Sequence, residues 1–62
     1  MMDLLDYPDD IIQTAQELWD AGCTLGMLKR EMQVFAVAAP HQLKRLGLIY
    51  GAMNEIRKSD AA

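Results

Sequence analysis

The hydrophobic pattern of this chain has the period of an α-helix in three successive segments. These segments cover about residues 8–21, 25–38 and 41–58. No stretch alternates between apolar and polar residues in the way that marks a half-buried strand. The sequence therefore predicts an all-α fold, a small three-helix bundle with short connections that forms a single domain over residues 1–62.

Residues that begin and end helices stand near the predicted boundaries. Asp6 is the expected N-cap of the first helix, and Pro8 and the carboxylates after it suit its first turn. Gly22 is expected to close that helix, and Thr24 to cap the second. Pro40 should end the second helix, because the residue before a proline is pushed out of helical geometry, and it suits the start of the third helix.

The middle segment is apolar on two opposite faces. One face can pack in the core of the protein, and the other then needs more of the same chain, a second copy or a different molecule. Two interpretations stay open: the second face is interior, or it is a docking surface. A helix that ends early, at Val34, would leave part of this face in a loop. The first face is Leu25, Leu28, Met32, Phe35 and Ala39, and the second is Met27, Val34 and Ala38, with Val37 beside it.

The third segment contains two glycines on one side, Gly47 and Gly51. Each costs about 1 kcal/mol relative to alanine inside a helix. A pair at this spacing makes a shallow strip on which another backbone can approach closely. The strip is interpreted either as room for the first helix or as a contact with a partner or a second copy, and a kinked helix is the third alternative.

The segment before the first helix alternates acidic and apolar residues. Leu4, Leu5 and Tyr7 provide much apolar surface for a free tail, and a small core gains from covering with them. We therefore expect this arm to lie over the bundle as a lid. The alternative is a short recognition segment.

The length of 62 residues limits how much stability a core can supply. A chain this short buries only about 60% of the surface that its unfolded form exposes, and small domains usually gain stability from disulfides, a metal or oligomerisation. Cys23 is the only cysteine and His41 the only histidine, which excludes an intrachain disulfide and a closed four-ligand zinc site. Oligomerisation or a bound partner remains.

No constellation of residues indicates catalysis. Cys23 and His41 are a nucleophile and a base with nothing in their spacing that requires contact. Asp9 and Asp10 are adjacent, so they diverge around a helix and lack the alternating ligands of a calcium loop. The glycine pairs lack the strand and the Lys-Ser/Thr of a phosphate loop. The prediction is a protein that is not an enzyme and has no cofactor, metal or small-molecule substrate.

The formal net charge of −3 conceals a division along the chain. The acidic first helix is interpreted as neutralising the basic second and third helices across their contacts. The alternative is a basic surface for an anionic partner. Before residue 21 the charged residues are Asp3, Asp6, Asp9, Asp10, Glu17 and Asp20, and after it they are Lys29, Arg30, Glu31, Lys44, Arg45, Glu55, Arg57, Lys58 and Asp60.

The second and third segments match the helix-turn-helix pattern of DNA-binding proteins only in part. Three positions depart from it: Lys29 where a small residue is usual, Gln33 where the turn usually has glycine, and Pro40 inside the expected recognition helix. No family is assigned on this partial match. It rests on Leu28, Met32, Val34 and Leu43, and the residues that would face DNA are His41, Gln42, Lys44 and Arg45.

The leading hypothesis is a non-catalytic module that binds a protein partner, or its own copy as a homodimer, and acts as a small regulator, inhibitor or adaptor. The partner-binding residues would be Met27, Val34, Val37, Ala38, Gly47 and Gly51. The alternative is a dimeric, helix-turn-helix-like DNA-binding regulator. No apolar run approaches the length of a membrane span and the acidic start lacks the basic region of a signal peptide, so we expect no membrane partner and a cytoplasmic location.

Overall fold

The computed structural model describes residues 3–61, and all of their regular structure is helical. A short 3₁₀ turn, η1 (Leu4–Asp6), leads into helix α1 (Asp9–Asp20). Helix α2 (Leu25–Ala38) is followed by a second 3₁₀ turn, η2 (Pro40–Gln42), which continues into helix α3 (Leu43–Ala61). The predicted all-α three-helix bundle is confirmed.

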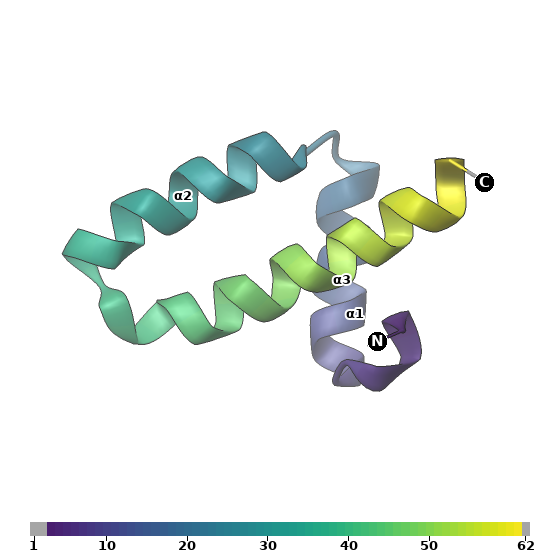
Figure 1. The fold of residues 1–62 in the computed structure, drawn as a ribbon, viewed down its shortest axis with the longest axis horizontal. Helices are drawn as coiled ribbons and strands as arrows, with labels where there is room; N and C mark the ends of the chain where they lie inside the picture. Colours follow the sequence, from purple (N-terminus) through teal and green to yellow (C-terminus); the bar gives the residue numbers. More distant parts are fainter. Residues whose placement is uncertain (1–2, 62) are drawn as a thin grey trace.

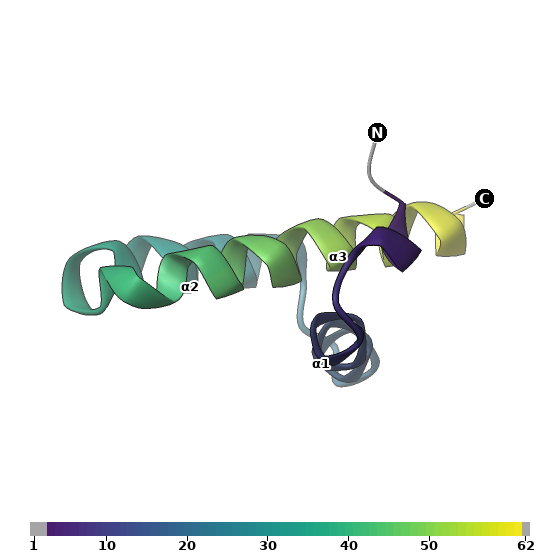
Figure 2. The ribbon, with the colours of Figure 1, turned by 90° about the horizontal axis from the view of Figure 1, so that it is seen from below.

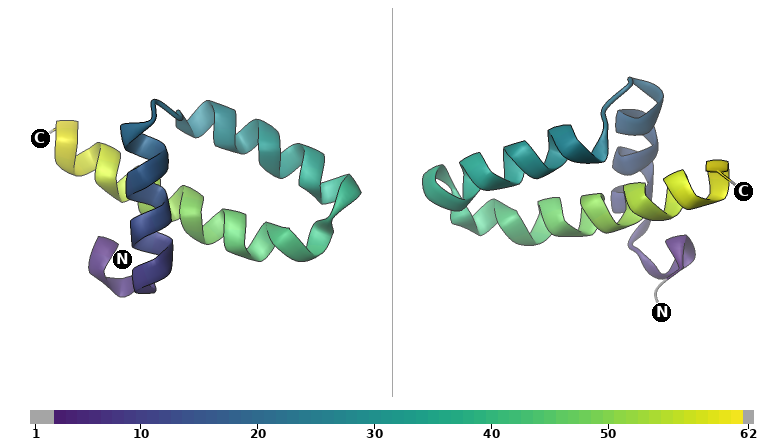
Figure 3. Two further views of the ribbon diagram at one scale, coloured as in Figure 1. Left: turned by 180° about the vertical axis from the view of Figure 1, so that it is seen from behind. Right: turned by 45° about the horizontal axis from the view of Figure 1, so that its top comes forward.

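Helices α2 and α3 run side by side in opposite directions as a long hairpin, and α1 crosses behind α3 (Figure 1). In Figure 2 α3 is seen lengthwise and α1 nearly end-on, so α1 runs across the hairpin and not along it. The two further views agree (Figure 3). Helices α1 and α2 both pack on α3, and no Cα atom of α1 lies within 8 Å of a Cα atom of α2 among the described residues.

The core forms where α1 meets α3, together with the start of α2. No residue from 29 to 48 is buried, although this range includes more than half of α2, all of η2 and the start of α3. We call this range the distal half of the hairpin, because it projects beyond α1 (Figure 1). The buried residues are Ile11, Ala15, Leu28, Ile49, Ala52, Met53 and Ile56.

The turn between α1 and α2 has the predicted chemistry. Gly22 adopts a φ of 89°, a left-handed conformation that glycine takes without steric cost. The amide of Cys23 donates to the carbonyl of Leu18 at 2.9 Å and that of Gly22 donates to Trp19 at 3.1 Å, which is a Schellman motif. The Thr24 hydroxyl then accepts a hydrogen bond from the backbone amide of Met27 at 3.2 Å. Both predicted caps are confirmed.

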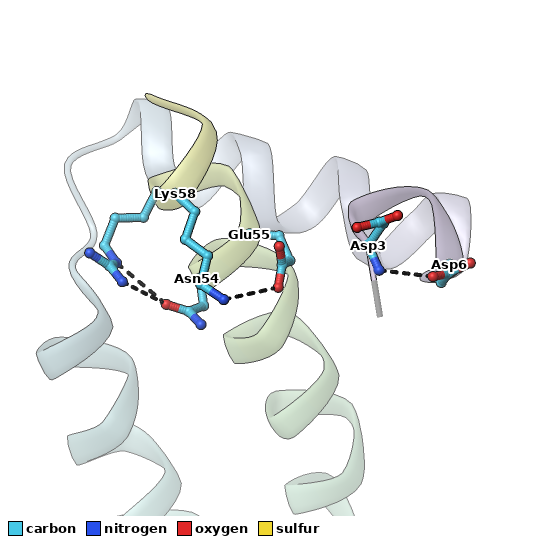
Figure 4. Close-up of polar contacts among 6 residues, drawn as sticks. Asp3, Asp6, Asn54, Glu55 and Lys58 are labelled. Carbon is cyan, nitrogen blue, oxygen red and sulfur yellow. Dashed lines mark hydrogen bonds and ion pairs between the residues drawn. The ribbon is translucent and has the colours of Figure 1, made fainter. Parts of the chain in front are cut away.

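The predicted N-cap of α1 is wrong. Asp6 belongs to the η1 turn, where its Oδ2 atom accepts the Asp3 amide at 2.8 Å (Figure 4). Extended backbone at Tyr7 and Pro8 then separates Asp6 from the helix. Pro8 itself is the capping position, and it has no side-chain acceptor.

The ends of the hairpin also differ from the predicted bounds. The amide of Gln42 donates to the carbonyl of Ala39 at 3.0 Å, so Pro40 opens a tight 3₁₀ turn and α3 proper starts at Leu43. At its other end α3 extends to Ala61. Helix α2 continues past Val34 to Ala38, which excludes the early end.

The arm before α1 partly behaves as the predicted lid. Leu4 and Tyr7 pack against the core, whereas Leu5 is 89% exposed. Residues 1 and 2 lie outside the described residues, so the described part of the arm begins at Asp3.

Candidate interaction surface

The outer side of α2 carries the second apolar face. Met27, Val34 and Val37 are 54%, 60% and 88% exposed, and Ala38 is exposed as well, whereas Leu28 on the opposite side is 4% exposed. Met27 and Val34 lie one heptad apart and Ala38 lies one turn further, so these three share a face, with Val37 at its edge. The interpretation of this face as interior is therefore wrong. We call these four residues the α2 face.

Charged side chains border the α2 face. Lys29, Arg30 and Glu31 are all exposed. None of them forms an ion pair within the part of the chain that the structure describes. The surface thus combines an apolar strip with charges that are available to a partner.

The two glycines of α3 have different surroundings. A Cβ atom added at Gly51 would meet the ring of Tyr7, with 3.0 Å to Cζ, whereas one added at Gly47 would meet nothing within 4 Å. The arm therefore fills the strip at Gly51, where the sequence suggested room for the first helix or a partner. Because Tyr7 covers Gly51, we no longer assign Gly51 to the partner surface. A contact between Gly47 and a partner stays a prediction.

The four residues of the predicted nucleic-acid site lie together at the turn of the hairpin. His41 and Gln42 belong to η2, Lys44 and Arg45 to the first turn of α3, and all four are exposed. Helix-turn-helix units cross at about 90–120°. Helices α2 and α3 instead run antiparallel, so the arrangement differs from that motif (Figure 1).

The hairpin turn that carries these four residues borders a groove that the sequence did not predict. The start of α1 forms one wall of this groove, and η2 with the start of α3 forms the other. It has a volume of about 350 Å³. No local signal reveals it, because its walls are at least 30 residues apart in sequence. Its lining residues are Pro8, Asp10, Ile11, His41, Lys44, Arg45 and Leu48.

Charge neutralisation between helices is limited to one ion pair in the described structure. Arg45 Nη1 lies 3.0 Å from Asp10 Oδ2, joining α3 to α1. The other pair, between Lys58 and Glu55 at 3.5 Å, lies within α3 (Figure 4). No ion pair joins α1 to α2 within residues 3–61, so the predicted neutralisation of both basic helices by α1 is wrong for α2.

The two residues considered as nucleophile and base lie far apart. Cys23 precedes α2 and His41 follows it, and a helix of this length spans about 20 Å. Cys23 is half-buried and packs against the core. Within residues 3–61, no group of three or more His, Cys, Asp or Glu side chains is placed to hold a metal ion.

Comparison with known proteins adds no further constraint. No protein-family model, curated protein or solved structure matches this chain. In the described residues, no helix combines the length and the apolar character needed to cross a membrane.

Proposed function

We propose that this protein is a non-catalytic binding module that docks a protein partner through the α2 face. One observation carries the proposal. The structure leaves four large hydrophobic side chains exposed within its described residues, and three of them, Met27, Val34 and Val37, lie on this one helix.

The energetics favour burial of this face. Complete burial of a valine or methionine side chain is worth about 1.5–3 kcal/mol relative to exposure. These three side chains lie on one helix, so a single complementary surface can cover them together. Methionine adapts its shape to different neighbours, which suits Met27 to a docking surface.

Substitutions on α2 test the proposal. Val34→Glu and Met27→Glu place a charge on the α2 face, whereas Gln33→Glu adds the same charge to a polar position of the same helix. The first two should weaken association by about tenfold or more and the third should not, because only the first two bury a charge.

The readout depends on the state of the chain in solution. Light scattering over a range of concentrations identifies a homodimer, whose dissociation constant is then compared among the variants. If the chain is a monomer, each of the four chains is immobilised and incubated with a cell lysate. The amount of each protein that the native chain retains is then compared with the amount that each variant retains.

Folding must be separated from binding in these variants. Circular dichroism should show native helicity for all three, since their side chains are exposed. Leu28→Ala provides the opposite reference, because truncating this buried leucine should cost about 2–5 kcal/mol of unfolding free energy. Unfolding of Val34→Glu, or unchanged association, would contradict the proposal.

A further inference from the structure

The groove between the start of α1 and the hairpin turn has an apolar floor and a basic rim. Its apolar lining includes Ile11, which is buried, and Leu48, which is half-buried. His41, Lys44 and Arg45 are exposed around it. An apolar side chain with a carboxylate next to it would satisfy both parts of such a site.

The basic rim has capacity for an added carboxylate. Lys44 forms no ion pair or side-chain hydrogen bond with the described residues. The pair between Arg45 and Asp10 is exposed on both sides, and such pairs contribute little and exchange readily. Asp10 also lies in the wall of the groove, where it would repel a dense row of phosphates.

The same chain presents a segment with the complementary chemistry. Among the described residues Leu5 is the fourth exposed large hydrophobic side chain and, at 89%, the most exposed of the four. Asp3 and Asp6, both exposed, lie on either side of it. Tyr7 at Gly51 and Leu4 at the core hold the arm on its own bundle, which leaves Leu5 facing outward.

We propose that the groove of one chain binds the arm of a second copy, with Leu5 on the apolar floor and the arm carboxylates beside Lys44 and Arg45. The arm ends at Tyr7 and the groove begins at Pro8, so donor and acceptor surfaces are neighbours on each chain. Two copies can therefore dock reciprocally around a two-fold axis, each arm staying on its own bundle while its Leu5 enters the groove of the other copy, and the assembly closes as a dimer. This contact is separate from the α2 face.

Sedimentation equilibrium of the full chain, from micromolar to millimolar concentration, tests this inference. The native chain should form dimers and no larger species, and Leu5→Ser should weaken dimerisation by about tenfold or more, since each dimer buries two of these leucines. Leu5 is exposed in the single chain, so this variant should retain native helicity.

A charge exchange makes the test specific. Lys44→Glu and Asp6→Lys should each weaken dimerisation by about tenfold, because each brings like charges together in both contacts. An equimolar mixture of the two variants should restore a heterodimer, because every arm then meets a groove residue of opposite charge. Asp3→Lys repeats the arm variant without altering the carboxylate that accepts the amide within η1.

Lys58→Glu is the matched control, because Lys58 lies outside both the groove and the α2 face. It makes the same charge change at an exposed site outside the groove and should leave dimerisation unchanged. A chain that stays monomeric would overturn the inference, as would a dimer that ignores Leu5→Ser and the charge exchange. A dimer lost in Val34→Glu instead would overturn it while supporting the α2 face.

Two other occupants give distinct results. Duplex DNA of about 20 base pairs, bound by a monomeric chain in a way that Lys44→Glu abolishes, would make the groove a nucleic-acid site and overturn the inference. Binding of an acidic peptide of unrelated sequence to the groove without any dimer of the native chain would overturn it as well.

Discussion

The contact between Tyr7 and Gly51 shows how a single residue type fixes the position of the arm. The tyrosine ring lies where the side chain of any other residue at 51 would start. Glycine leaves room for the tyrosine ring at this site, which explains its presence despite its low helix propensity. Gly47, one turn earlier, has open space beside it and no such reason within its own chain.

Alanine at these two positions should therefore have different effects. Gly47→Ala should stabilise the chain by about 1 kcal/mol, through helix propensity alone. Gly51→Ala should gain less or lose stability, because the new methyl group displaces Tyr7. Urea unfolding followed by circular dichroism measures both. In a Tyr7→Ala background the Gly51→Ala gain should rise to about 1 kcal/mol, and equal effects in both backgrounds would contradict the packing described.

At the scale of elements, the turn between α1 and α2 is the most strongly encoded. The Thr24 hydroxyl is the only side chain that caps one of the described α-helices through a hydrogen bond at its N-terminus. Thr24→Ala should lower the unfolding free energy by about 1 kcal/mol, whereas Thr24→Ser retains the acceptor and should remain near the native value. Thermal unfolding compares the three chains. A large loss in the serine variant would assign the role to the methyl group instead.

Helix existence and the inner face of α2 could be predicted, because both follow from periodicity over adjacent residues. The capping roles of Gly22 and Thr24 could be predicted for the same reason, since the hydrogen bonds of each cap join residues only three to five positions apart. The prediction of Asp6 as the N-cap of α1 is wrong because its carboxylate accepts a hydrogen bond from a nearer donor, the amide of Asp3. That bond lies inside a turn that the spacing of apolar residues does not reveal.

For the candidate surfaces too, features that depend on adjacent residues could be predicted and features that depend on the packing of distant segments could not. The apolar residues of the α2 face could be predicted, but their exposure could not, because it depends on where α1 packs. The sequence places Gly51 on a partner surface because nothing local to α3 indicates that Tyr7 reaches it. The groove could not be predicted because Asp10 and Arg45 are separated by 35 residues and meet only in the folded chain.

For the whole molecule, packing is concentrated at one end. The last buried residue of α2 is Leu28, and the next along the chain is Ile49. The distal half of the hairpin thus contributes helical hydrogen bonds and half-buried contacts, such as those of Phe35 and Leu46, but no buried side chain. Regions with few buried apolar contacts open at lower free energy than the core.

Hydrogen exchange should detect this gradient. Amides in residues 29–48 should exchange through local opening, well before those of residues 49–57, which carry four of the buried side chains. Mass spectrometry of proteolytic fragments at several exchange times measures both regions. Uniform protection across α3 in a monomer would contradict the expectation, whereas protection of α2 that appears only on association would map the docking surface.

Helices α1 and α2 are consecutive in sequence and yet have no Cα atoms within 8 Å of each other in the described structure, since each packs on α3. The turn that joins them therefore acts as a tether, whose hydrogen bonds set where α1 ends and where α2 begins. Closing a flexible loop costs only about 0.6 kcal/mol more for each doubling of its length. Residues inserted after Gly22 would thus cost mainly the bond from the Cys23 amide to the Leu18 carbonyl, while the contacts of both helices with α3 stay in place, so the domain can acquire an additional loop here without repacking its core.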